Sequence, residues 1–298
     1  LTRAYTKKNK IVKFEGGWHG GYDALDIGVK PPFNIPESAG LTEGATKDTI
    51  IAPYNDLEGV VRKVKDEEIA GIIIEPVLGA GGGIPADKEF LKGLKEICEE
   101  KNALLIFDEV ITGFRLSFGG AQQLFDIKAD LTCLGKIMGG GLPAAAFGGR
   151  ADIMDMLAPL GPVYQAGTLS GNPIATAAAN ATLDILAKED CYQRLESSAS
   201  LLQAGLASAA EGANISVTIN RVGSLMSCFF TDRPVRNFAD VRSTNIKMFK
   251  KFFTEMLKQG IYLAPSAYEA MFVSLAHTKQ DIKKTIEAAK NSFIRIKK

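Results

Sequence analysis

The fold of this 298-residue chain is decided by Ala103-Leu-Leu-Ile-Phe-Asp-Glu-Val110 and Asp130-Leu-Thr-Cys-Leu-Gly-Lys-Ile-Met-Gly-Gly-Gly-Leu-Pro143. Each stretch is a short apolar run that stops at a polar residue, Asp108 in the first and Lys136 in the second. Continuous apolar runs of this length are typical of strands buried on both faces of a parallel sheet. Because ligands of such sheets bind at the carboxyl ends of the strands, we expect Asp108 and Lys136 to face one site.

Strand-like and helix-like patterns alternate around these two runs. We predict buried strands at residues 11–14, 70–75, 104–107 and 131–134, and helices at 57–65, 90–101 and 172–186. This alternation predicts an α/β fold, a mostly parallel sheet covered by helices, in a domain of residues 1–186. Residues 28–46 are rich in proline and glycine without periodicity, and a loop of that length is typical of a lid.

The pattern changes after residue 186. Helices are predicted at 191–210 and 244–259, and short strands at 221–231, 260–263 and 271–275. These elements predict a smaller α+β domain of residues 187–298. The sequence leaves the strand order open.

The composition argues for a small-molecule enzyme. Lys and Arg total 35 against 34 for Asp and Glu, so the net charge of +1 gives no reason to expect binding to nucleic acid or to a membrane. The four cysteines lack the paired spacing of zinc sites or disulfide scaffolds, so we expect free thiols, a cytoplasmic protein and no metal. The first residue is not methionine, and we expect the chain to begin partway through a longer protein.

The two polar strand ends point to one cofactor, pyridoxal phosphate. A carboxylate such as Asp108 keeps the pyridine nitrogen protonated, and an amine such as Lys136 forms a Schiff base with the aldehyde. Taken singly, the lysine could be a solvated charge and the aspartate a helix cap. Glu75 ends a third apolar run and is expected at the same edge of the sheet.

Five segments in order resemble the class III, or omega, aminotransferases of fold type I. They are Lys13-Phe-Glu-Gly-Gly-Trp-His-Gly20, Asp108-Glu-Val-Ile-Thr-Gly-Phe-Arg115, Leu134-Gly-Lys-Ile-Met-Gly-Gly-Gly-Leu-Pro143, Tyr164-Gln-Ala-Gly-Thr-Leu-Ser-Gly-Asn-Pro173, and Gly260-Ile-Tyr-Leu-Ala-Pro-Ser266 with Ser274-Leu-Ala-His277. The resemblance covers essentially the whole chain. It implies the large domain of the fold type I transferases, lacking its amino-terminal part, followed by a small domain.

The resemblance also implies roles around the cofactor ring. Lys136 would be the catalytic lysine, and Asp108 would pair with the pyridinium nitrogen. Val110 would pack on one ring face, although ordinary core is an equal alternative for it. Trp18 would stack on the other face, where the family's aminomutases have a tyrosine, so an aromatic face is kept and a hydroxyl is lost.

Four further residues acquire roles only through the resemblance. Thr168 would donate to the cofactor phosphate across a subunit interface, which implies a homodimer; its alternative is a turn threonine. His19 and Glu75 would support the ring and its phenolic oxygen, or be satisfied buried polar residues. Glu269 matches an active-site glutamate of the aminomutases and would otherwise be a surface charge.

Within the family the segments are most similar to the aminomutases, which move an amino group within one aminoaldehyde, pass through the pyridoxamine phosphate form and serve porphyrin biosynthesis. Ala80 and the loop at 28–46, which differs from that of the aminomutases, favour a second hypothesis. In this hypothesis the protein is an aminotransferase that uses a β- or ω-amino acid and a 2-oxo acid. The family's Ser-Gly-Thr-Glu-Ala phosphate cradle does not occur in these residues, so a third reading is an inactive or cofactor-binding fragment.

Overall fold

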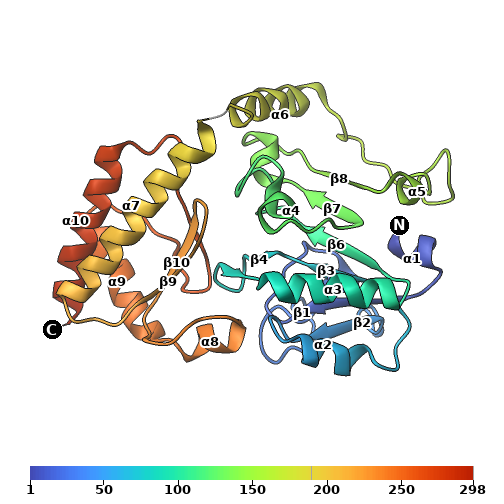
Figure 1. Cartoon of the computed structure of the whole chain (residues 1–298), viewed down its shortest axis with the longest axis horizontal. Helices are drawn as coiled ribbons and strands as arrows, with labels where there is room; N and C mark the ends of the chain where they lie inside the picture. Colours follow the sequence, from blue (N-terminus) through green and yellow to red (C-terminus); the bar gives the residue numbers. More distant parts are fainter. Residues whose placement is uncertain (189, 298) are drawn as a thin grey trace. The chain divides into compact units, whose positions relative to one another are not determined.

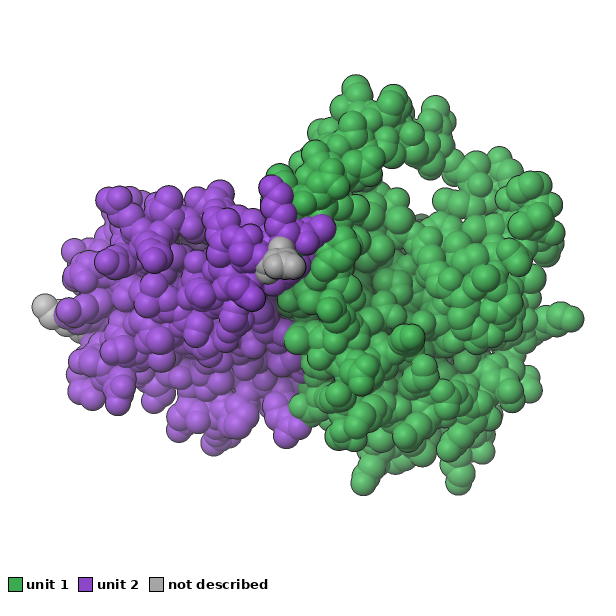
Figure 2. Space-filling view, turned by 45° about the horizontal axis from the view of Figure 1, so that its top comes forward, with its two compact units in different colours: residues 1–77, 86–186 green, residues 78–85, 187–298 purple. Residues whose placement is uncertain are grey.

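The computed structural model describes residues 1–188 and 190–297, and their contacts divide the chain into two compact units. The first unit comprises residues 1–77 and 86–186. The second unit comprises residues 78–85 and 187–298. Figure 2 shows the first unit in green and the second in purple.

A six-stranded sheet forms the centre of the first unit, in the order β2-β1-β3-β6-β7-β8. The strands are β1 (Lys10–Phe14), β2 (Thr49–Ala52), β3 (Ile69–Ile74), β6 (Leu104–Asp108), β7 (Leu131–Leu134) and β8 (Ala146–Gly149). Neighbouring strands from β2 to β7 are parallel, and only β8 pairs antiparallel, with β7. The predicted mostly parallel sheet is therefore confirmed.

Two of the helices of this unit pack against the sheet through a buried apolar face. In α2 (Leu57–Val64), Asp56 caps the first turn by accepting a hydrogen bond from the Gly59 amide, and Val60 and Val64 are buried. In α3 (Lys88–Glu100), the buried residues recur at helical spacing. Figure 1 shows α3 lying along the sheet. The other helices are α1 (Thr2–Thr6), α4 (Gly120–Phe125), α5 (Ala151–Met154) and α6 (Pro173–Leu186), with 3₁₀ turns η1 (Asp23–Leu25) and η2 (Lys136–Gly139).

The second unit packs helices on a small antiparallel sheet. The sheet has the order β11-β10-β9, with β9 at Thr218–Val222, β10 at Leu225–Phe229 and β11 at Met271–Phe272, while the short strands β4 (Val77–Leu78) and β5 (Ile84–Pro85) pair with each other. The helices are α7 (Cys191–Gly212), α8 (Phe238–Ser243), α9 (Ile246–Lys258) and α10 (Lys279–Ile296). Their core includes Phe252 and Phe293, whose stacked ring centroids are 4.5 Å apart.

Two strand predictions in this unit were wrong. Residues 221–231 do not form one strand, because the chain reverses at Gly223, whose φ of 54° permits a tight turn between β9 and β10. Residues 260–263 pair with no strand in the described part of the chain; the Ile261 amide instead donates to the Met256 carbonyl at the end of α9. Among the described residues, none of the helices combines the length and hydrophobicity needed to cross a bilayer.

Candidate functional site

Three neighbouring strands bring Glu75, Asp108 and Lys136 to one edge of the sheet. β3 pairs with β6 and β6 pairs with β7, so the order that the sequence left open places these strands side by side. In this register Ile74 lies opposite Phe107, and Asp108 lies opposite Cys133. Glu75 therefore follows directly after Ile74, and Lys136 lies two residues beyond the end of β7, on either side of the strand that ends in Asp108.

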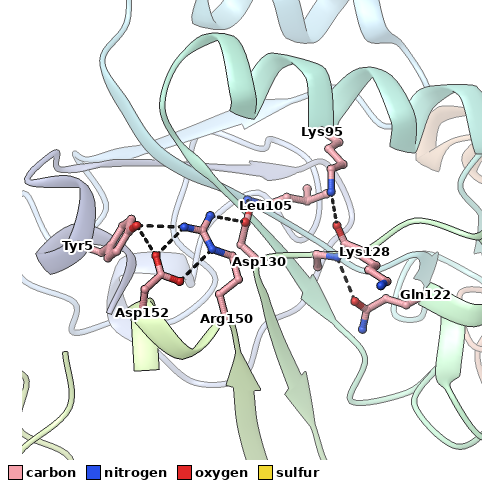
Figure 3. Close-up of polar contacts among 9 residues, drawn as sticks. Tyr5, Lys95, Leu105, Gln122, Lys128, Asp130, Arg150 and Asp152 are labelled. Carbon is pink, nitrogen blue, oxygen red and sulfur yellow. Dashed lines mark hydrogen bonds and ion pairs between the residues drawn. The ribbon is translucent and has the colours of Figure 1, made fainter. Parts of the chain in front are cut away.

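The opposite end of the same strands is held by a polar network. Asp130, just before β7, accepts hydrogen bonds from the Leu105 amide and from Arg150 Nη1, both at 2.9 Å. Arg150 also binds Asp152, which accepts a hydrogen bond from the Tyr5 hydroxyl at 2.6 Å (Figure 3). The hydrogen bond from Arg150 lowers the pKa of Asp152 to about 2, so this carboxylate is charged at neutral pH. The network fixes the starts of β6 and β7 relative to each other.

Asp108 is a buried carboxylate with a defined orientation. Only 7% of the residue is exposed, because it ends a strand of apolar residues. Its Oδ2 atom lies 2.8 Å from Nδ1 of His19, and its Oδ1 atom accepts a hydrogen bond from the Val110 amide at 3.1 Å. The imidazole of His19 is also buried, and its Nε2 atom has no hydrogen-bond partner within the described residues.

The loop that carries Trp18 is attached to Glu75. The Trp18 amide donates to Oε1 of Glu75 at 2.8 Å, and the Tyr54 hydroxyl donates to the Glu75 carbonyl at 2.9 Å. Glu75 is buried, whereas Trp18 is 41% exposed. Glu75 therefore binds the backbone of the loop, and the indole ring of Trp18 stays partly exposed to solvent.

Lys136 is exposed and lies in the left-handed region, with φ 47°, at the start of η2. Val110 packs beside the preceding residue, since a Cβ atom added to Gly135 would lie 3.4 Å from a Val110 methyl carbon. Helix α6 packs against η2, and a Cβ atom on Gly140 would lie 2.3 Å from Thr182 Oγ1. The absence of a side chain at Gly140 therefore allows α6 to approach the turn that presents Lys136.

Two predicted site residues lie outside the strand ends that carry this group. Thr168 is exposed, in a turn that precedes α6. Glu269 is exposed in the second unit, where it borders an apolar cavity of about 450 Å³ that Leu206, Phe252 and Met256 also line. The roles assigned to both residues stay predictions.

Three buried charged residues, Lys13, Asp26 and Glu109, were not singled out from the sequence. Glu109 accepts hydrogen bonds from the Thr112 hydroxyl at 3.0 Å and from the Ala121 amide at 2.5 Å, so this carboxylate holds the first turn of α4. Lys13 is 0% exposed in β1, and its ammonium donates to backbone carbonyls. The available signal for Lys13 was a charged residue within the apolar run Ile11–Phe14.

The chain matches known proteins over nearly its whole length. The family model for aminotransferase class-III matches residues 1–293. The glutamate-1-semialdehyde 2,1-aminomutase of Desulforamulus reducens is 52% identical, over 98% of this chain and 69% of that protein. A solved transaminase with pyridoxal phosphate bound is 28% identical, with a TM-score of 0.87 over 99% of this chain and 69% of the other. The β-phenylalanine aminotransferase of Variovorax paradoxus is 31% identical, with a TM-score of 0.83 over 97% and 65%.

Proposed function

The chain belongs to the class-III aminotransferase family, and on that basis we propose that it is a pyridoxal-phosphate-dependent aminomutase that converts glutamate 1-semialdehyde to 5-aminolevulinate. One observation carries the proposal. The buried carboxylate of Asp108 and the amine of Lys136 lie at the ends of neighbouring parallel strands, in a chain that is 52% identical to such an aminomutase. The product would enter porphyrin biosynthesis.

The residues at this edge of the sheet fit pyridoxal phosphate. Asp108 offers a buried, oriented carboxylate for a protonated ring nitrogen, and Val110 and Trp18 offer apolar and aromatic surface for the two ring faces. The buried Nε2 atom of His19 can bond to a polar group of the ligand. When bound, the cofactor supplies an electron sink for the carbon–hydrogen bonds that the reaction breaks.

Lys136 performs the proton transfers in this proposal. Its Nζ atom delivers a proton to the carbon that becomes the new amine-bearing carbon and takes a proton from the neighbouring carbon that becomes the carbonyl. The nitrogen that reaches the first carbon comes from the aminated form of the cofactor, and the nitrogen that leaves the second carbon returns to it. The pyridoxamine phosphate form belongs to the same cycle. The irregular loop at residues 28–46 would delay the escape of the substrate while these steps proceed.

We propose the remaining roles by family resemblance. Thr168 donates to the cofactor phosphate of the neighbouring subunit in a homodimer, and its exposure suits a contact of that kind. Glu269 acts at the substrate end of the site. The division into domains of residues 1–186 and 187–298 follows the family pattern, and a cytoplasmic location suits the four free cysteines.

The deciding experiment is incubation of the purified protein, loaded with cofactor, with glutamate 1-semialdehyde and no amino acceptor. The proposal predicts 5-aminolevulinate from the wild type and none from Lys136→Ala. A strict requirement for an added 2-oxo acid would instead favour an aminotransferase, the reading that Ala80 and the 31% identical β-phenylalanine aminotransferase support. A wild type that shows no visible absorption after incubation with the cofactor would support the non-catalytic reading.

A further inference from the structure

Lys13 is a lysine in an unusual position. It lies in the middle of β1, where Ile11, Val12 and Phe14 are also buried, and its side chain has no exposed surface. Lysine is almost never fully buried unless its ammonium is paired, because removing the charge from water is costly. A buried lysine in a strand that leads into the proposed site therefore needs a structural explanation.

The ammonium of Lys13 has three hydrogen-bond acceptors, all of them backbone carbonyls. Its Nζ atom lies 2.9 Å from the Gly17 oxygen, 2.8 Å from that of Leu25 and 2.5 Å from that of Ile27. These contacts use all three N–H groups of the ammonium. Gly17 lies just before Trp18, and Leu25 and Ile27 lie where the loop returns, so one atom joins the two ends of the loop.

A single peptide group is held from both sides. The carbonyl of Gly17 and the amide of Trp18 belong to the same peptide bond; Lys13 binds its oxygen, and Oε1 of Glu75 accepts from its N–H at 2.8 Å. A planar group fixed at both its donor and its acceptor has a defined orientation. This orientation sets the direction in which the Trp18 side chain leaves the backbone.

Oppositely charged groups accompany the buried ammonium. Burial lowers the pKa of Lys13 to about 8, and the carboxylates of Glu75 and Asp26, the latter itself buried, partly oppose this lowering. Lys13 and Glu75 thus form a pair of opposite charges on either side of the peptide group between Gly17 and Trp18. The next residue, His19, lies against Asp108.

We propose that Lys13 is a positioning residue: by binding the carbonyls at both ends of the loop from Gly17 to Ile27, it holds Trp18 and His19 where they meet the cofactor. This inference rests on the proposed function, because it assumes that pyridoxal phosphate binds beside Trp18. Lys13 itself touches neither cofactor nor substrate.

The test uses Trp18 as a reporter, since it is the one tryptophan of the chain. The apoprotein is titrated with pyridoxal phosphate while the emission of Trp18 is followed, and acrylamide quenching is measured without cofactor. In Lys13→Met we expect an apparent Kd for pyridoxal phosphate raised about tenfold, and stronger acrylamide quenching, because the loop loses charged hydrogen bonds. An unchanged Kd together with unchanged acrylamide quenching overturns the proposal.

Lys8→Met is the matched control. Lys8 also donates to two backbone carbonyls, those of Lys101 and Asn102, but it is not part of the loop at residues 17–27. This variant should bind the cofactor and respond to acrylamide as the wild type does. If the wild type bound no pyridoxal phosphate, the proposed function would fail, while the acrylamide comparison would still decide the role of Lys13.

A measurement on the wild type covers the case in which Lys13→Met does not fold. Hydrogen exchange of the Trp18 and Leu25 amides, which donate to Glu75 Oε1 and to the Tyr22 carbonyl, should be much slower than exchange of the exposed residues 42–44. Exchange of these two amides as fast as that of residues 42–44 would show an unrestrained loop and would overturn the proposal.

Discussion

Asp108 and Glu109 are adjacent acids with different surroundings: Asp108 lies against His19 at the candidate site, whereas Glu109 binds the first turn of α4. Both are buried. His19 and the Val110 amide hold the Asp108 carboxylate in one orientation. A carboxylate with a fixed orientation is suited to binding a ligand. Glu109 has its acceptor capacity taken up by Thr112, Ala121 and Gln122. The two carboxylates should therefore respond differently to the same substitution.

We expect Asp108→Asn to lower turnover by about two orders of magnitude or more, because a neutral amide does not stabilise a protonated ring nitrogen. Glu109→Gln should instead lower the free energy of unfolding by about 1–3 kcal/mol, because the new amide N–H groups face other donors. Steady-state kinetics and urea unfolding of both variants check this pair. If turnover per folded molecule fell equally in Asp108→Asn and Glu109→Gln, the two carboxylates would not have the different roles described.

Lys136→Ala should abolish activity and the visible absorption of the cofactor-loaded protein. Its effect on folding should be small, because the side chain is exposed. Lys7 is the control, since it is also exposed and also adopts a positive φ, at 58°. Lys7→Ala should keep both activity and colour, and the two melting temperatures should agree closely. Retention of colour by Lys136→Ala would count against the assignment.

Burial lowers the pKa of Lys13 to about 8 from its ordinary 10.5, although neighbouring carboxylates oppose this effect. Below pH 8 the lysine is protonated in both folded and unfolded chains. Between pH 8 and 10.5 only the unfolded chain binds the proton, so stability should rise with pH, by up to about 3 kcal/mol. Urea unfolding at pH 7.5 and pH 10, compared between wild type and Lys13→Met, isolates this contribution. An identical pH dependence in the two proteins would contradict it.

The core of the second unit gives a prediction about stability alone. Phe293 is fully buried and stacks on Phe252, so Phe293→Ala should lower the free energy of unfolding by about 3–5 kcal/mol. Phe272 is 43% exposed, and Phe272→Ala should cost clearly less, about 1 kcal/mol. Calorimetric unfolding of both variants provides the comparison, and equal losses would contradict the packing described for this unit.

The strands that carry the site could be predicted because their residues are apolar on both faces. The runs predicted at 70–75, 104–107 and 131–134 became β3, β6 and β7 with ends shifted by at most one residue. Strand β8 was not predicted, because Ala146–Gly149 is rich in glycine, which has a low strand propensity. The strand forms because it pairs with β7. Helix α10 was also missed, although Thr278 and Asp281 form a capping box at its start.

The site was only partly predictable for a related reason. Apolar runs that end in polar residues pointed to Asp108 and Lys136, but the strand order that makes them neighbours depends on contacts between distant segments. The burial of Lys13 has the same origin, since its partners Gly17, Leu25 and Ile27 become close only when the loop folds back. Thr168 and Glu269 received roles from family resemblance alone.

The most direct test of the central claim is a crystal structure of the protein with pyridoxal phosphate bound. We predict that the ring nitrogen lies within hydrogen-bonding distance of the Asp108 carboxylate and that Lys136 Nζ reaches the aldehyde carbon of the cofactor. A cofactor bound elsewhere, or Asp108 and Lys136 side chains directed away from a common ligand, would contradict the account.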